Sequence, residues 1–114
     1  MIDRKDLLPV IEALIDATNA FDVEAALAQF APNAVIDDPS VGEKFSGLTG
    51  IREYLERFFV GYHTVTRLLS VKIRSKRKAL VRVDFTGDFG HEIGLLEMAF
   101  TADGLIEHVD ADLE

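Results

Sequence analysis

The sequence contains no cysteine, only three prolines, and far fewer basic than acidic residues. Without cysteine there can be no disulfide, no thiolate zinc site and no thiol nucleophile, so any catalytic group must offer oxygen or nitrogen. Twelve Lys and Arg oppose 20 Asp and Glu, which gives a formal net charge of -8. Attraction to nucleic-acid phosphates or to acidic ligands is therefore not expected.

Long hydrophobic runs are also absent. No stretch approaches the roughly 20 apolar residues of a membrane span. The first six residues are mostly charged and do not resemble the apolar segment of a secretory signal. We therefore expect a cytoplasmic protein that does not bind membranes.

The composition is that of a globular domain, with 48% hydrophobic and 28% charged residues in a chain of 114. A chain of this length buries roughly two thirds of its unfolded surface, which suffices for one core and one ligand cavity. We expect a single domain over residues 1–114 with any active site inside the fold.

The spacing of the apolar residues differs between the first and second halves of the chain. Apolar residues at helical spacing predict three helices, over residues 7–20, 23–30 and 49–61. Two short strands are expected before the third helix, at 34–37 and 43–46. After Gly61 the period changes to two, which predicts four long strands at 65–75, 79–89, 92–102 and 105–113.

This order of elements resembles the NTF2-like superfamily, and within it the SnoaL-like and ketosteroid-isomerase-like proteins. The segments that carry the resemblance are Asn19–Asp22, Phe30–Pro39, Gly47–Tyr54 and Asp103–His108. The resemblance implies a cone-shaped α+β fold, in which three N-terminal helices pack on a strongly curved, mainly antiparallel sheet and enclose a cavity. It implies a small apolar or polycyclic ligand. No cofactor and no metal site are expected, because the three histidines lack ligand spacing.

Asp38 is the first candidate catalytic residue. It precedes Pro39 at the end of a predicted strand and falls on the position of the steroid isomerases' catalytic base, which moves a proton between carbons. Tyr54 and His108 are the candidate proton donors. The alternative for Asp38 is a turn-forming role, since Asp before Pro is common where a strand ends.

Other positions depart from the isomerases. Alignment without gaps places Leu14, Leu55 and Leu96 where those enzymes carry hydrogen-bond donors or their support. A cavity without such donors loses several kcal/mol of transition-state stabilisation, so efficient 3-oxosteroid isomerisation is not expected. The residues expected to line the pocket are Leu14, Leu55, Phe58, Phe59, Leu96 and Met98.

A second candidate set is Arg82, Asp84 and Asp110, which resembles the Asp-Arg-Asp arrangement of limonene-type epoxide hydrolases. Arg82 and Asp84 share one face of a strand and could form an ion pair. Val81 and Val83 lie on the opposite face of that strand, and only one of the two faces can point into the core. The apolar alternation favours Arg82 and Asp84 facing solvent, whereas alignment to the isomerases favours the cavity.

The sequence leaves open whether the protein is an enzyme. An isomerase or cyclase using acid/base catalysis, a hydrolase, and a non-catalytic ligand-binding or dimerisation module all remain compatible with this fold. A homodimer is expected, because the strands carry more apolar residues than one core needs, so the outer sheet face should be partly apolar.

Overall fold

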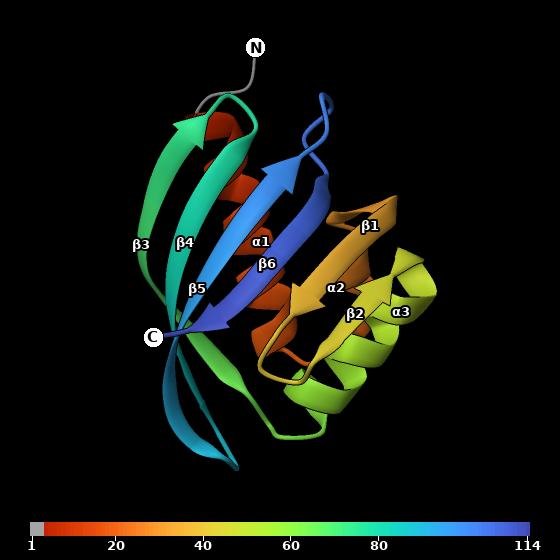
Figure 1. Cartoon of the computed structure of the whole chain (residues 1–114), viewed down its shortest axis with the longest axis vertical. Coiled ribbons are helices and arrows are strands. Elements are labelled where there is room, and N and C mark those ends of the chain that lie inside the picture. Colours follow the sequence, from red (N-terminus) through yellow and green to blue (C-terminus); the bar gives the residue numbers. More distant parts are fainter. Residues whose placement is uncertain (1–3) are drawn as a thin grey trace.

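The computed structural model describes residues 4–114, so Met1, Ile2 and Asp3 of the charged N-terminal segment lie outside it. Helices pack on one side of a six-stranded sheet (Figure 1). The elements are α1 (Arg4–Asn19), α2 (Val23–Leu27), β1 (Phe30–Asp38), β2 (Glu43–Ser46), α3 (Gly47–Leu55), the π-helical turn η1 (Glu56–Val60), β3 (Val65–Ser75), β4 (Lys78–Gly87), β5 (Gly90–Phe100) and β6 (Ile106–Leu113). The predicted α+β class is confirmed. Within this range no helix combines the length and apolar character needed to cross a membrane.

The sheet has the strand order β2-β1-β6-β5-β4-β3. β1 and β6 run parallel, and the other neighbouring pairs are antiparallel. The sheet bends so that α1 lies behind its long strands while α3 lies beside β1 and β2 (Figure 1). The largest fully buried side chains lie between these layers: Leu7, Ile11, Ile51, Val81, Val83, Met98, Phe100 and Ile106.

The segment around Pro32 differs from the prediction. The helix expected over 23–30 ends at Leu27, and the strand expected over 34–37 extends from Phe30 to Asp38. Proline lacks the N–H that a sheet ladder needs, and it is tolerated in strands at bulges. The register of β1 against β6 shifts between Phe30 and Val35, so Pro32 lies within this irregularity. The proline therefore interrupts strand pairing without ending the strand.

The predicted third helix changes its hydrogen bonding after Leu55 and ends as a π-helical turn. Thr64 caps this turn, since its Oγ1 donates to the Phe58 carbonyl at 2.6 Å and its N–H donates to that of Phe59 at 2.9 Å. A Cβ on Gly61 would lie 2.5 Å from the Arg57 carbonyl oxygen, so only glycine fits there. Such π turns widen a helix locally and re-aim side chains, here Phe58 and Phe59.

Candidate functional site

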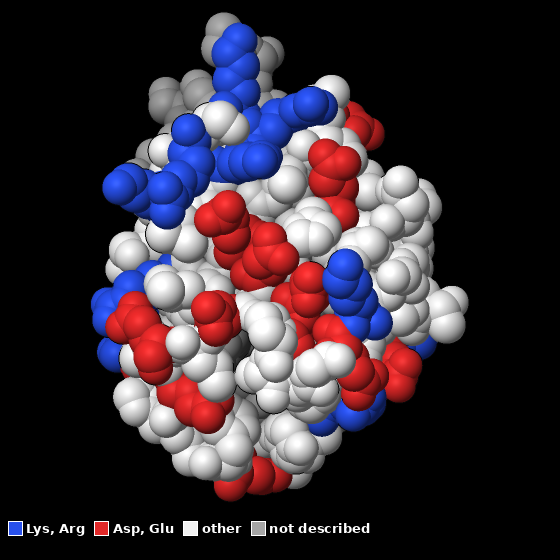
Figure 2. Space-filling view, viewed as in Figure 1, with Lys and Arg blue, Asp and Glu red and all other residues white. Residues whose placement is uncertain are grey.

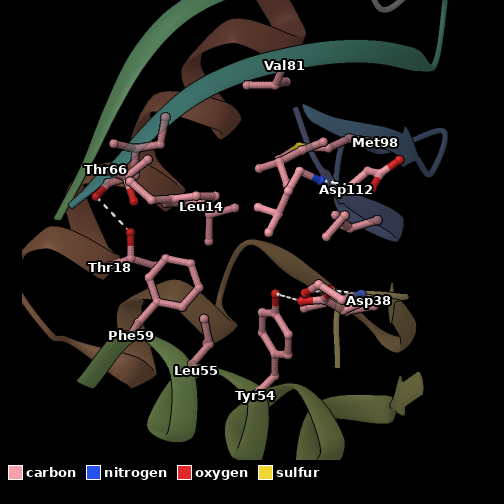
Figure 3. Close-up of a pocket in the computed structure, with 18 of the residues that line it drawn as sticks. Leu14, Thr18, Asp38, Tyr54, Leu55, Phe59, Thr66, Val81, Met98 and Asp112 are labelled. Atoms are coloured by element: carbon pink, nitrogen blue, oxygen red, sulfur yellow. Dashed lines mark hydrogen bonds between the residues drawn. The ribbon is translucent and has the colours of Figure 1, made fainter. Parts of the chain in front are cut away.

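A cavity of about 80 Å³ lies between α1, α3 and the curved sheet. Its wall is mainly apolar, and the polar side chains in it are Thr18, Asp38, Ser40, Tyr54, Thr66 and Asp112 (Figure 3). A wider outer chamber of about 280 Å³ shares Asp38, Tyr54 and Phe59 with this inner cavity. The outer chamber adds an aromatic rim formed by Phe58, Tyr62 and Phe89.

Asp38 lies in the wall that both chambers share. Strand alternation in β1 turns Ile36 and Asp38 toward the interior, and Asp38 is only 7% exposed. Its Oδ2 accepts a hydrogen bond from the Tyr54 hydroxyl at 2.6 Å. Its Oδ1 accepts from the Ser40 N–H at 3.0 Å and from the Ser40 hydroxyl at 2.5 Å. One oxygen thus holds the turn after β1, while the other faces Tyr54.

This arrangement leaves acceptor capacity on one atom of Asp38. An ionised carboxylate offers about four acceptor sites, two on each oxygen. Ser40 occupies both sites of Oδ1, whereas Tyr54 occupies one site of Oδ2. The free site on Oδ2 is therefore the place where Asp38 can accept a proton from a bound molecule.

Tyr54 projects from α3 toward Asp38 (Figure 3). Its ring packs edge-on against Phe45, with 5.0 Å between the ring centroids, and contacts Phe58 at the same distance. Burial, followed by the hydrogen bond to Asp38 and the negative charge of that carboxylate, raises the pKa of Tyr54 above its ordinary value. Tyr54 is consequently a hydrogen-bond donor that keeps its proton.

Five of the six residues expected to line the pocket do so in the inner cavity: Leu14, Leu55, Phe59, Leu96 and Met98. Phe58 lines only the outer chamber, whereas Phe59 lines both. Sequence reasoning missed Ser40 and Thr66. Neither has a distinctive local pattern, since Ser40 follows a proline in a turn and Thr66 is the second residue of a strand.

The structure does not bring together Arg82, Asp84 and Asp110, the expected set of the epoxide-hydrolase alternative. Val81 and Val83 are fully buried, so Arg82 and Asp84 lie on the outer face of β4. Arg82 forms a bidentate pair with Glu114, at 2.7 and 2.8 Å. Asp84 pairs with Arg67 at 3.1 Å, and His91 Nε2 lies 2.6 Å from its other oxygen.

Asp110 is remote from that set, because it pairs across the sheet with Glu97 and is exposed. His108, the other expected proton donor, also lies outside the two chambers, so the structure does not bring it next to Asp38. The register between β5 and β6 shifts after Ile106, which turns Val109 and Ala111 inward. His108 therefore faces outward, with its Nδ1 3.6 Å from Asp110.

Electrostatically, the cavity is an apolar space with one buried carboxylate. Within residues 4–114, no three His, Asp or Glu side chains are grouped as a metal ion would require. The polar groups present can accept a proton at Asp38 and donate hydrogen bonds from Tyr54 and from hydroxyls. That set is suited to proton transfer on a neutral bound molecule.

Comparison with known proteins assigns the chain to a family. A model of the SnoaL-like domain matches residues 11–109. No curated protein matches the sequence significantly. The structure of a candidate polyketide cyclase from Sinorhizobium meliloti superposes with a TM-score of 0.84 at 24% identity, over 97% of this chain and 100% of that chain.

Two further structures are similar. A candidate ketosteroid isomerase from Kribbella flavida superposes with a TM-score of 0.85 at 17% identity, over 100% of this chain and 82% of that one. The second is the epoxide hydrolase/cyclase-like enzyme SalBIII, which has a role in pyran ring formation in the polyether salinomycin. It superposes with a TM-score of 0.86 at 18% identity, over 100% of this chain and 95% of that one.

These three likenesses fall below 25% identity and show the fold alone, which is the NTF2-like fold. The family match extends from the first helix to the last strand and includes Asp38 and Tyr54. The resemblance read from the sequence is confirmed, and the chain belongs to the family of SnoaL-like domains.

Proposed function

We propose that this protein is a cofactor-free acid/base enzyme of the isomerase or cyclase type, acting on a small, neutral, mostly apolar molecule. The observation that carries the proposal is the 2.6 Å hydrogen bond between Tyr54 and Oδ2 of Asp38 in the wall of an apolar cavity. The likeness to a candidate polyketide cyclase and to a cyclase-like enzyme supports the proposal at the level of the fold.

In the proposed reaction, Asp38 acts as a general base. Its free acceptor site on Oδ2 takes a proton from a carbon beside a carbonyl, and the electron pair of that C–H bond moves into the carbonyl to form an enolate. In a β,γ-unsaturated ketone this enolate is a dienolate, and the Asp38 carboxylic acid returns the proton to the γ-carbon, which is isomerisation. In a dicarbonyl compound the enolate carbon instead attacks the second carbonyl of the same molecule, which closes a ring, and the carboxylic acid returns the proton to the resulting alkoxide. Catalysis by one well-placed base contributes roughly 100- to 10,000-fold in rate.

Tyr54 has a positioning role in this scheme. It holds Oδ2 in one orientation, and its hydroxyl remains protonated because its pKa is raised. It contacts both chambers, so a bound carbonyl can compete with Asp38 for its hydrogen bond. A donor that keeps its proton in the presence of a base is suited to stabilising negative charge on the substrate.

The cavity restricts the substrate. Pockets for drug-sized molecules hold roughly 300–1,000 Å³, whereas the inner cavity holds about 80 Å³ and the outer chamber about 280 Å³. A polycyclic ligand would have to extend through both chambers. Leu14, Leu55 and Leu96 line the inner cavity without offering a donor, so we do not propose 3-oxosteroid isomerisation.

The second candidate function is ligand binding without catalysis. The observation that favours it is the pair of hydrogen bonds from Ser40, which gives Asp38 a structural role in the turn after β1. Under this alternative the cavity would hold a ligand, and Asp38 would only fix the wall. The two functions differ in whether a bound carbon acid exchanges its protons.

We also propose a homodimer formed through the outer face of the sheet. Carboxylates of Asp37, Asp110 and Glu97 lie side by side on β1, β6 and β5, with Asp110 paired to both others. Lys76, Arg77 and Lys78 lie at the β3–β4 turn, and Figure 2 shows basic side chains at one end of a face whose middle is acidic. We call Asp37, Asp110 and Glu97 the acidic row, and Lys76, Arg77 and Lys78 the basic turn. Two copies related by a twofold axis could place the basic turn of each over the acidic row of the other.

Deuterium exchange tests the catalytic proposal without knowledge of the natural substrate. The bicyclic ketone 2-tetralone is dissolved in D2O with the protein, and loss of the protons beside its carbonyl is followed by NMR. We expect wild-type protein to accelerate exchange and Asp38→Asn to lower the rate roughly 100-fold or more. Asp37→Asn is the matched control, because Asp37 faces away and lies 3.9 Å from Lys44. Binding of the ketone with exchange at the buffer rate would support the non-catalytic alternative.

A further inference from the structure

Thr66 carries a buried hydroxyl without a protein partner. The residue is 5% exposed and lies near the start of β3, where it lines the inner cavity. Among the residues that the structure describes, none forms a hydrogen bond with its Oγ1. Buried polar atoms are nearly always paired, so an unpaired hydroxyl in a cavity wall points to a ligand.

Two other buried threonines provide a comparison within the same fold. Thr18 Oγ1 donates to the Ile15 carbonyl at 3.0 Å, and Thr64 Oγ1 donates to the Phe58 carbonyl at 2.6 Å. These residues are 6% and 3% exposed, so their burial matches that of Thr66. The fold therefore pairs the buried hydroxyls of Thr18 and Thr64 but not that of Thr66.

The backbone of Thr66 is held firmly in place by Asn19, the last residue of α1. The Asn19 side chain accepts from the Thr66 N–H at 2.7 Å and donates to the Thr66 carbonyl at 2.9 Å. This double contact joins helix and strand where Thr66 faces the cavity. Asn19 contacts only the backbone of Thr66, so the Thr66 hydroxyl stays buried without a protein partner.

We infer that Thr66 Oγ1 is a ligand-binding group that hydrogen-bonds an acceptor oxygen of the substrate, such as a carbonyl or ether oxygen. This inference rests on the proposed function, because it concerns the substrate of the same cavity. Figure 3 shows Thr66 and Asp38 on opposite sides of the pocket, with Leu14 between them in that view. The substrate therefore carries its acceptor oxygen on one side of an apolar body and its reacting carbon nearer the other.

The geometry also defines what the substrate lacks. Most of the residues that line the inner cavity, among them Val81, Phe85 and Leu96, offer no polar side-chain atom. A charged group placed there would be buried without a partner, at a high cost. The substrate class is thus a neutral, compact ring compound with oxygen at one end, such as a cyclic ketone or ether.

Stability gives the first test, with no ligand needed. Thr66→Val keeps the shape of the side chain and removes an unpaired hydroxyl, so the melting temperature should stay unchanged or rise. Thr64→Val is the matched control, since it removes a paired hydroxyl of similar burial and should lower the melting temperature. A clear drop for Thr66→Val would mean that the hydroxyl has a structural partner, which would overturn the proposal.

Binding gives the second test, using 2-tetralone and tetralin, which share a bicyclic body and differ in the carbonyl. NMR titration of Thr66→Val should show roughly three- to tenfold weaker binding of 2-tetralone and unchanged binding of tetralin. Thr66→Ser keeps a hydroxyl and should retain the preference for the ketone. Equal affinity changes for both compounds, or no binding of either, would overturn the proposal.

The two proposals fail in different ways. If Thr66→Val weakens ketone binding while wild-type protein catalyses no deuterium exchange, the Thr66 contact stands and the catalytic role of Asp38 fails. If exchange depends on Asp38 while Thr66→Val binds 2-tetralone as wild type does, the catalytic proposal stands and the Thr66 contact fails.

Discussion

The hydroxyl of Tyr54 donates a 2.6 Å hydrogen bond to Oδ2 of Asp38 in the wall shared by the two chambers. Ser40 occupies the other oxygen with two donors. The two oxygens of one carboxylate thus have separate roles, one in the turn after β1 and one at the cavity. This division reconciles the turn-forming and the catalytic interpretations of Asp38, which the sequence presents as alternatives.

Removal of the Tyr54 hydroxyl should destabilise the protein. Tyr54→Phe leaves Oδ2 of a 7% exposed carboxylate without its protein donor. Hydrogen bonds to charged groups contribute about 1.5–3 kcal/mol, so we expect a loss of that order in the free energy of unfolding, measured by urea denaturation. Tyr62→Phe is the control, because Tyr62 is 45% exposed and should change stability little. A loss as small as that of the control would show that the Tyr54 contact contributes nothing.

The raised pKa of Tyr54 predicts a loss of stability in alkali. The unfolded chain ionises this tyrosine near its ordinary pKa of about 10, whereas the folded chain resists ionisation. The stabilisation is therefore complete below pH 10 and declines as the pH rises further. In a Tyr62→Phe variant, which retains Tyr54 alone, phenolate absorbance should appear together with unfolding. Ionisation near pH 10 in the folded protein would contradict the burial of Tyr54.

The outward orientation of Asp84 and Asp110 predicts that neither takes part in chemistry. Asp84→Asn and Asp110→Asn should keep the wild-type rate of 2-tetralone exchange, because both side chains lie on the outer sheet face. The same variants should leave the rate with a small terpene epoxide at that of wild type. Loss of epoxide hydrolysis in both variants would restore the epoxide-hydrolase interpretation.

The proposed dimer should depend on salt. Light scattering at tens of micromolar should give twice the monomer mass at low ionic strength, with a shift toward monomer as salt screens the contacts between basic turn and acidic row. Replacing Lys76 and Arg77 by glutamate should give monomer at low salt. A monomer under all conditions would contradict the dimer.

The sequence predicts the helices and long strands because hydrophobic periodicity reports which side of an element is buried. For the first strand, period two leaves two inward pairs, Ile36 with Asp38 or Val35 with Asp37, and the resemblance to the steroid isomerases selects the first pair. His108 shows where this reasoning ends. A single register shift after Ile106 reverses which side chains of β6 point inward, and no local residue pattern predicts this shift.

Long-range contacts account for most of the remaining differences. The partnership of Tyr54 with Asp38 joins α3 to β1, and the clamp of Asn19 on Thr66 spans 47 residues. Neither pair has a sequence spacing that indicates contact. The unpaired state of the Thr66 hydroxyl is likewise a property of the packed cavity and not of the strand that carries it.

Chemical rescue is the most direct test of Asp38 as a base. The measurement is the rate of 2-tetralone deuterium exchange by Asp38→Ala, with and without added acetate, in protein whose circular dichroism matches wild type. We expect a rate near that of buffer without acetate, and partial recovery as acetate enters the space left by the side chain. Exchange at the wild-type rate in Asp38→Ala without acetate would contradict it.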